Sequence, residues 1–175
     1  MNNELLPIVN EEGCVTGHAT RQECHSGSML LHPVVHLHIL RSDGCIFLQR
    51  RSLSKDIQPG KWDTAVGGHV DYGETVESAL YREVAEELGL KNINPIKLTS
   101  YKFQSSIETE LVNTFYIIVD KNDTDFNPVY DPTEIDEVRF WHYREIEFAI
   151  GKNILTQNFE MEYNLIKPTL IKLSD

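Results

Sequence analysis

The sequence predicts a mixed α+β or α/β fold, in which a mixed β-sheet is sandwiched between helices. Short runs with strand-like alternation recur along the chain, one segment has the four-residue apolar spacing of a surface helix, and no repeat interrupts them. Mixed strands with few helices typically pack as a sheet covered by helices. The 175 residues, 41% hydrophobic, are expected to form one domain over residues 1–175, with its core at about 30–165.

The first elements are expected to be strands. Residues 5–21 predict two short strands around the turn Glu11-Glu12-Gly13, and a polar stretch follows at 22–28. Residues 32–40 alternate in polarity, so His36 and His38 are expected to face the side of the strand opposite its apolar side chains. The turn at 41–44 then favours a hairpin with a strand at 45–50.

A helix is expected from about Thr75 to Leu88, closed by Gly89 in the left-handed cap position. Its apolar stripe has a four-residue spacing. The stripe consists of Val76, Leu80, Val84 and Leu88. The other expected elements are a loop at 52–61, a short strand at 64–66 followed by Gly67-Gly68 in a loop, strands near 97–103, 110–119 and 137–141, and a C-terminal helix interrupted at Pro168.

Composition excludes several classes of protein. A net charge of −11 disfavours duplex nucleic acid as a partner, because phosphate binding requires Lys and Arg. No run of about 18 apolar residues predicts a membrane span, and the first residues lack the basic and apolar regions of a signal peptide. The scattered Cys14, Cys24 and Cys45 suggest neither a disulfide framework nor a zinc site. We therefore expect a soluble cytoplasmic protein.

The strongest motif places four carboxylates and an arginine in fixed register. Gly68 is followed after five residues by Glu74 and, seven residues later, by Arg82-Glu-Val-Ala-Glu-Glu-Leu-Gly-Leu90. Glu83, Glu86 and Glu87 are three and four residues apart, so they lie on neighbouring positions of one helix face. Such a cluster suits Mg²⁺ or Mn²⁺, which prefer hard oxygen ligands. The alternative is a solvated acidic helix end, which is common for isolated Glu-Glu pairs.

Residues 68–90 resemble a complete Nudix box, in which every specified position is met. The resemblance implies the Nudix fold and hydrolysis of a small-molecule diphosphate. It assigns Glu83, Glu86 and Glu87, with the backbone carbonyl of Gly67, to a metal site, and it pairs Arg82 with Glu74. It makes Glu83 the first candidate for the general base. Proteins of that superfamily are often dimers, so a homodimer is one possibility, and the sequence leaves the oligomeric state open.

Motifs outside the box carry a second resemblance, among them Ile8-Val-Asn10, Thr16-Gly17, Leu53-Ser54-Lys55 and Pro59-Gly60-Lys-Trp62. They resemble isopentenyl-diphosphate isomerases of the same superfamily, and the resemblance extends from about Ile8 to Trp141. It implies a second divalent-metal site and a set of basic residues that bind the substrate diphosphate. The implied metal ligands are His25, His32, His69, Glu108 and Glu110, and the implied diphosphate-binding residues are Arg21, Arg51 and Lys55. Imidazole and carboxylate together suit several divalent ions. Tyr101 roughly matches an active-site tyrosine, whereas His36 and His38 match no ligand position.

One departure from that pattern favours hydrolysis over isomerisation. Isomerases of this type carry a proton-transferring cysteine immediately before the Gly-His pair, and this chain has Gly67 there. The proton shuttle opposite Glu110 therefore lacks one end. We expect a Mg²⁺- or Mn²⁺-dependent hydrolase that uses an activated water, with Glu110 as the second candidate base. An isomerase that dispenses with the cysteine and a non-catalytic nucleotide-binding module are the alternatives, and the substrate stays open between nucleoside and prenyl-like diphosphates.

Overall fold

A computed structural model of the chain describes residues 4–55 and 57–174. Its centre is a seven-stranded mixed sheet with the path β5-β4-β3-β8-β7, in which β6 also pairs with β3 and β9 with β4. The long strands β3 (Leu31–Arg41) and β8 (Thr109–Val119) run parallel, and the other pairings in the sheet are antiparallel. The remaining strands are β4 (Cys45–Arg51), β5 (Trp62–Asp63), β6 (Val66–His69), β7 (Ile96–Gln104) and β9 (Ile135–His142).

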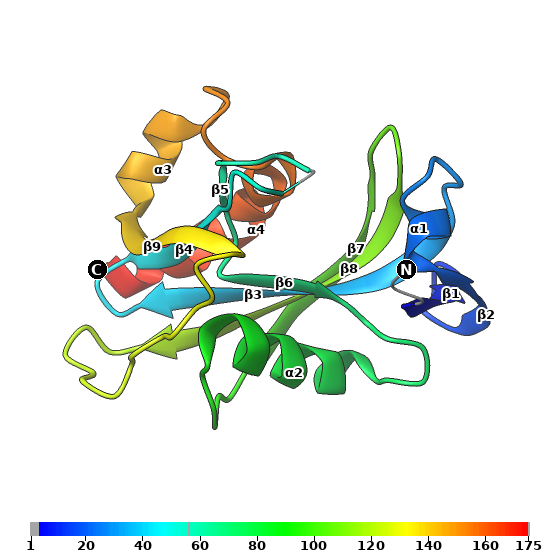
Figure 1. Cartoon of the computed structure of the whole chain (residues 1–175). Helices are drawn as coiled ribbons and strands as arrows, with labels where there is room; N and C mark the ends of the chain where they lie inside the picture. The colour runs from blue at the N-terminus through cyan, green and yellow to red at the C-terminus, as the bar shows by residue number, and fades with distance from the viewer. Residues whose placement is uncertain (1–3, 56, 175) are drawn as a thin grey trace.

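Helices cover both faces of this sheet (Figure 1). Helix α2 (Val76–Leu88) lies on one face, where its buried side chains pack against Val35, Leu37 and Ile39 of β3. Helices α3 (Tyr143–Ala149) and α4 (Gln157–Ser174) lie on the other face and pack against β4 and β9. The predicted sandwich of a mixed sheet between helices is confirmed.

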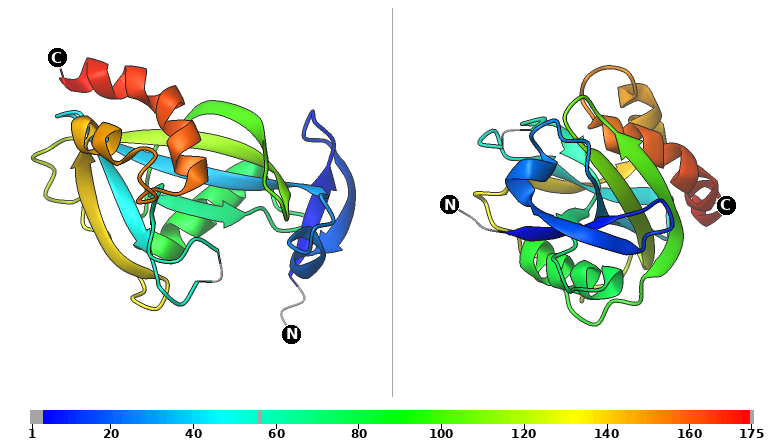
Figure 2. Two further views of the ribbon diagram at one scale, coloured as in Figure 1. Left: turned by 90° about the horizontal axis from the view of Figure 1, so that it is seen from above. Right: turned by 90° about the vertical axis from the view of Figure 1, so that its right-hand side faces the viewer.

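A separate N-terminal unit lies beside the first residues of β3 (Figures 1 and 2). It is a two-stranded antiparallel sheet, β1 (Leu5–Val9) and β2 (Val15–Thr20), followed by the single turn α1 (Arg21–Cys24). Thr20 and Glu23 form a capping box at the start of α1, which the polar composition of this stretch concealed. The unit joins the main body through a backbone hydrogen bond of 2.9 Å from Tyr72 to Leu5.

The predicted α2 is confirmed together with its ends: Thr75 caps the N-terminus and Gly89 has φ +63° at the C-terminus. The strand expected at 64–66 was wrong, because Thr64 and Ala65 separate β5 from β6, and Gly67 and Gly68 lie inside β6. The interruption expected at Pro168 was also wrong, since α4 continues through that residue. In the described part of the chain no helix combines the length and apolarity needed to cross a bilayer.

Candidate functional site

A cleft of about 550 Å³ opens where the N-terminal unit, β6, α2 and the start of α4 approach one another. It brings together residues that are far apart in the sequence. The predicted site residues that line it are Arg21, His25, Arg51, Lys55, Gly67, His69, Glu83, Glu87, Glu108 and Glu110. Two of the predicted metal ligands do not line it: His32 is fully buried, and the Glu86 side chain is 61% exposed to solvent. One cleft therefore contains most of both predicted constellations.

Arg82 forms hydrogen bonds with several residues of the box. Its guanidinium donates to both carboxylate oxygens of Glu74, at 3.1 and 2.9 Å, and to Glu83 at 2.7 Å. The Nη2 atom also donates to the backbone carbonyl of His69 at 3.0 Å, which ties the helix to the end of β6. The predicted pairing of Arg82 with Glu74 is confirmed. Such a bidentate arrangement fixes the carboxylates in position.

Gly68 allows Glu83 to lie against β6. A Cβ atom added at Gly68 would be 2.0 Å from Cδ of Glu83, so a side chain at this position would displace the Glu83 carboxylate. The glycine of the box therefore allows the carboxylate to lie this close to the strand.

The three glutamates of the box that lie on α2, Glu83, Glu86 and Glu87, differ in their environments. Burial raises the pKa of Glu83, although Arg82 opposes the shift. Burial and repulsion from Glu83 raise the pKa of Glu87 to about 8, and Gln49 donates to this carboxylate at 3.1 Å. Glu86 turns toward solvent and accepts a hydrogen bond from Arg82 at 3.3 Å. Glu83 and Glu87 therefore line the cleft, whereas Glu86 lies outside its lining.

The histidines and glutamates of the second constellation meet at the other side of the cleft. His25, His32 and His69 bring ring nitrogens within 4.8 Å of one another, and His32, Glu108 and Glu110 form a second such group. The parallel pairing of β3 with β8 sets His32 opposite Glu110, which accounts for the contact between distant segments. Among the described residues these are the groups whose spacing suits a metal ion.

Burial favours the neutral imidazole at two histidines of this cluster, His32 and His69. Burial lowers the pKa of His32, and burial together with the charge of Arg21 holds the pKa of His69 well below its usual range. Burial and the charge of Glu108 raise the pKa of Glu110 to about 7. Neutral imidazole is the form that binds a metal ion.

His32 also has an unsatisfied polar atom. Its Nδ1 bonds the carbonyl of Leu30 at 2.9 Å, whereas its buried Nε2 has no hydrogen-bond partner in the described part of the chain. A buried unpaired nitrogen is costly unless a ligand satisfies it. The residues present therefore fit a divalent cation held by this cluster.

The predicted diphosphate-binding residues lie at the edge of the cleft, each beside a carboxylate. Arg21 pairs with Glu4 at 3.2 Å, and Arg51 pairs with Asp63 at 3.3 Å. Lys55 pairs with Glu134. Of the three, Arg51 is the most fixed, because it also donates to the carbonyl of Ile57 at 3.1 Å.

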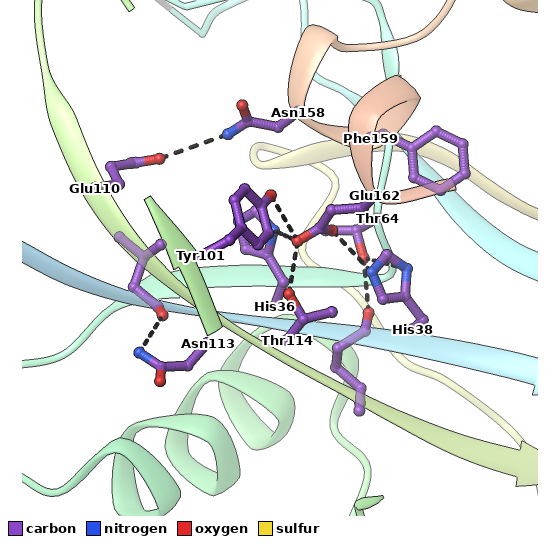
Figure 3. A network of polar contacts seen from close by, with 12 residues as sticks. His36, His38, Thr64, Tyr101, Glu110, Asn113, Thr114, Asn158, Phe159 and Glu162 are labelled. Carbon is purple, nitrogen blue, oxygen red and sulfur yellow. Dashed lines mark hydrogen bonds and ion pairs between the residues drawn. The ribbon is translucent and has the colours of Figure 1, made fainter. Parts of the chain in front are cut away.

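A buried polar network that the sequence did not reveal lies next to the cleft (Figure 3). Glu162 of α4 is fully buried and accepts hydrogen bonds from His36, His38, Tyr101 and Thr114. Burial alone would lower the pKa of His36, but the charge of Glu162 raises it to about 9. Tyr101, which was expected near the active site, donates to Glu162 and does not line the cleft. The alternation of His36 and His38 was visible in the sequence, but the pairing with Glu162 was not.

Comparisons with known proteins agree with this geometry. A model of the NUDIX domain matches residues 30–159. An uncharacterized Nudix hydrolase, all7351, from Nostoc sp. is 36% identical over 146 residues, which cover 80% of each chain. An isopentenyl-diphosphate Delta-isomerase from Kocuria rhizophila is 28% identical over 84% of this chain and 82% of its own.

Solved structures show the same fold. DR0079 from Deinococcus radiodurans superposes with a TM-score of 0.75 and 26% identity, over 93% of this chain and 99% of the other. A MutT Nudix hydrolase from Burkholderia pseudomallei has a TM-score of 0.61 at 20% identity, over 78% of this chain and 98% of its own. The family model, the relatives and the complete box lead to one conclusion: the chain belongs to the Nudix family, and isopentenyl-diphosphate isomerases are among its relatives.

Proposed function

We propose that this protein hydrolyses a diphosphate bond in a small organic diphosphate with the help of Mg²⁺ or Mn²⁺. The observation that carries the proposal is the complete box in its folded form. Its half-buried glutamates Glu83 and Glu87 line the same cleft as the cationic side chains of Arg51 and Lys55. A cleft lined by both carboxylates and cations suits a substrate whose phosphates bind a metal ion and basic residues together.

The residues that would hold the principal cation are Glu83, Glu86, Glu87 and the carbonyl of Gly67. The repulsion that raises the pKa of Glu87 is the kind that a bound cation offsets. The cluster of His25, His32, His69, Glu108 and Glu110 would hold a second divalent ion. When bound, such ions neutralise charge on the phosphoryl group and make a water molecule more acidic.

The protein's own side chains then bind the diphosphate and accept the proton. Arg51 and Lys55, with Arg21 at the rim, bind the diphosphate by replacing their carboxylate partners with phosphate oxygens. Water attacks one phosphorus, the bond from that phosphorus to the bridging oxygen breaks, and a carboxylate accepts the proton of the water. Glu83 is the first candidate for this base and Glu110 the second. Arg82 keeps Glu83 oriented through the 2.7 Å contact.

Isomerisation of isopentenyl diphosphate is the second candidate function, and the relatives with that activity favour it. Gly67 weighs against isomerisation, because it offers no side chain to carry a proton. Incubation with isopentenyl diphosphate in deuterium oxide separates the two functions. Deuterium in recovered substrate supports isomerisation, and phosphate release without exchange supports hydrolysis.

The direct test is a phosphate-release screen across nucleoside diphosphate derivatives and prenyl diphosphates, with Mg²⁺ and with Mn²⁺. We expect Glu87→Gln to reduce turnover of the best substrate by at least about 100-fold, since catalytic metal ligands contribute several kcal/mol. The matched control is Glu77→Gln, an exposed glutamate in the first turn of the same helix, which should keep wild-type turnover. Near-normal turnover of Glu87→Gln, or no release from any substrate, would contradict the proposal.

A further inference from the structure

Glu162 forms an unusually complete set of hydrogen bonds beneath the cleft (Figure 3). Its side chain is 0% exposed and accepts from His36 at 3.0 Å, His38 at 2.8 Å, Tyr101 at 2.9 Å and Thr114 at 2.8 Å. A buried carboxylate is stable when it is hydrogen-bonded and when a partner balances its charge. His36 and His38 are the basic partners among these four, so the charge is balanced by an imidazole.

The two histidines use their rings differently. His38 is fully buried and engages both nitrogens, Nε2 with Glu162 and Nδ1 with the hydroxyl of Thr64 at 3.1 Å. His36 engages Nδ1 alone, and its ring lines the cleft. In residues 4–55 and 57–174 no group hydrogen-bonds to Nε2 of His36. This nitrogen is therefore available to a bound molecule.

The edge of the His36 ring is uncovered because Gly67 has no side chain. His36 on β3 and Gly67 on β6 are directly opposite in an antiparallel pair, so their side-chain positions lie on the same face of the sheet. A Cβ atom added at Gly67 would be 3.3 Å from Cδ2 and 3.5 Å from Nε2 of His36. A larger side chain at residue 67 would separate the imidazole from the cleft.

We propose that His36 is a substrate-binding residue, whose Nε2 donates a hydrogen bond to an anionic oxygen of the diphosphate in the cleft. Glu162 is the positioning residue: by accepting from Nδ1 it fixes the ring and balances its charge. All three residues line the cleft, and the His36 side chain is the most buried of them, at 10% exposed against 27% for Arg51 and 33% for Lys55. The identity of the ligand as a diphosphate rests on the proposed function, but the contact itself requires binding and not turnover.

The test measures binding of methylenediphosphonate, which is not hydrolysed, to the full chain in Mg²⁺ by calorimetry. His36→Asn retains an amide that can donate to Glu162 from near the Nδ1 position and lacks the part of the ring that reaches the cleft. We expect its Kd to rise by about 10-fold or more, the usual effect of losing a charge-assisted hydrogen bond. Gly67→Ala, which covers the ring edge and keeps the network, should raise Kd by at least about threefold on the same grounds.

The matched control is His38→Gln, which changes the other imidazole on the same carboxylate at a position away from the cleft. It should lower the melting temperature as much as His36→Asn does and leave Kd within about twofold of the wild type, because no hydrogen bond to the ligand is lost. In protein labelled with ¹⁵N-histidine, the Nε2 resonance of His36 should shift when the probe is added, and that of His38 should not. A purely structural role would not produce this difference.

Several outcomes overturn the inference. They are a wild-type Kd in His36→Asn, an equal rise of Kd in His38→Gln, an unchanged His36 resonance, and a wild type that does not bind the probe. If the probe binds through His36 but no diphosphate is hydrolysed, the proposed hydrolysis fails and this contact stands. If diphosphates are hydrolysed and His36→Asn binds the probe normally, this inference alone fails.

Discussion

Glu87 couples the stability of the protein to pH when no metal is bound. Burial and the charge of Glu83 raise its pKa from 4.5 to about 8. The folded state therefore holds the proton more tightly than the unfolded state, so this stabilisation is complete below pH 4.5 and is lost as the pH rises through about 8. We expect the melting temperature of the metal-free protein to fall over this window, and to fall less in Glu87→Gln, whose amide carries no charge.

The measurement is thermal unfolding of both proteins in a chelator at pH values between about 5 and about 8, the range in which the two states differ in bound protons. Because Glu110 also has a raised pKa, the slope should decrease in the variant and not vanish. Parallel curves for wild type and variant would show that Glu87 does not titrate in this range.

At the scale of the secondary-structure elements, Pro168 is a destabilising residue inside α4. The helix runs from Gln157 to Ser174, and Pro168 is exposed two-thirds of the way along it. Proline lacks the N–H that would bond the carbonyl one turn earlier, and its ring crowds that carbonyl. We expect Pro168→Ala to increase the free energy of unfolding by about 1–3 kcal/mol, measured by urea denaturation. Thr169→Ala is the control, and an equal or smaller gain in Pro168→Ala would contradict the explanation.

The elements that could be predicted are those whose signals are local. The cap Thr75, the apolar stripe and Gly89 all lie within or beside α2, and its bounds were correct. The continuation of α4 past Pro168 depends instead on tertiary packing, because Ile166 and Leu170 on both sides of the proline are buried in the core. Similarly, β6 contains two glycines with low strand preference and is a strand because β3 pairs with it. The helix and strand propensities of single residues do not predict these tertiary contacts.

At the scale of the whole molecule, one part of the candidate site could be predicted from the sequence and another part could not. The box and the His/Glu constellation could be predicted because spacing and resemblance are readable in one chain. The partnership of His36 with Glu162 could not, since it joins residues 126 positions apart through the packing of α4 on the sheet. Glu162 is one of two glutamates in α4, nothing in the local sequence distinguishes it from Glu160, and its burial follows from the complete fold.

The fold places two groups of candidate metal ligands around one cleft, the box glutamates with Gly67 and the His/Glu cluster, from elements that meet only when the chain is folded. Because the two groups have no residue in common, each should bind a divalent ion without the other. We expect the wild type to bind about two equivalents of Mn²⁺, and His69→Gln and Glu87→Gln to bind about one each, since each lacks a ligand of one site.

Metal content after dialysis, combined with a Mn²⁺ titration, would measure this stoichiometry. The double variant should bind none with appreciable affinity, whereas His18→Gln, a change at a histidine outside both groups, should keep both ions. If either single variant lost both equivalents, the two groups would form one coupled centre, and the carboxylates of α2 would depend on the histidines at the other side of the cleft.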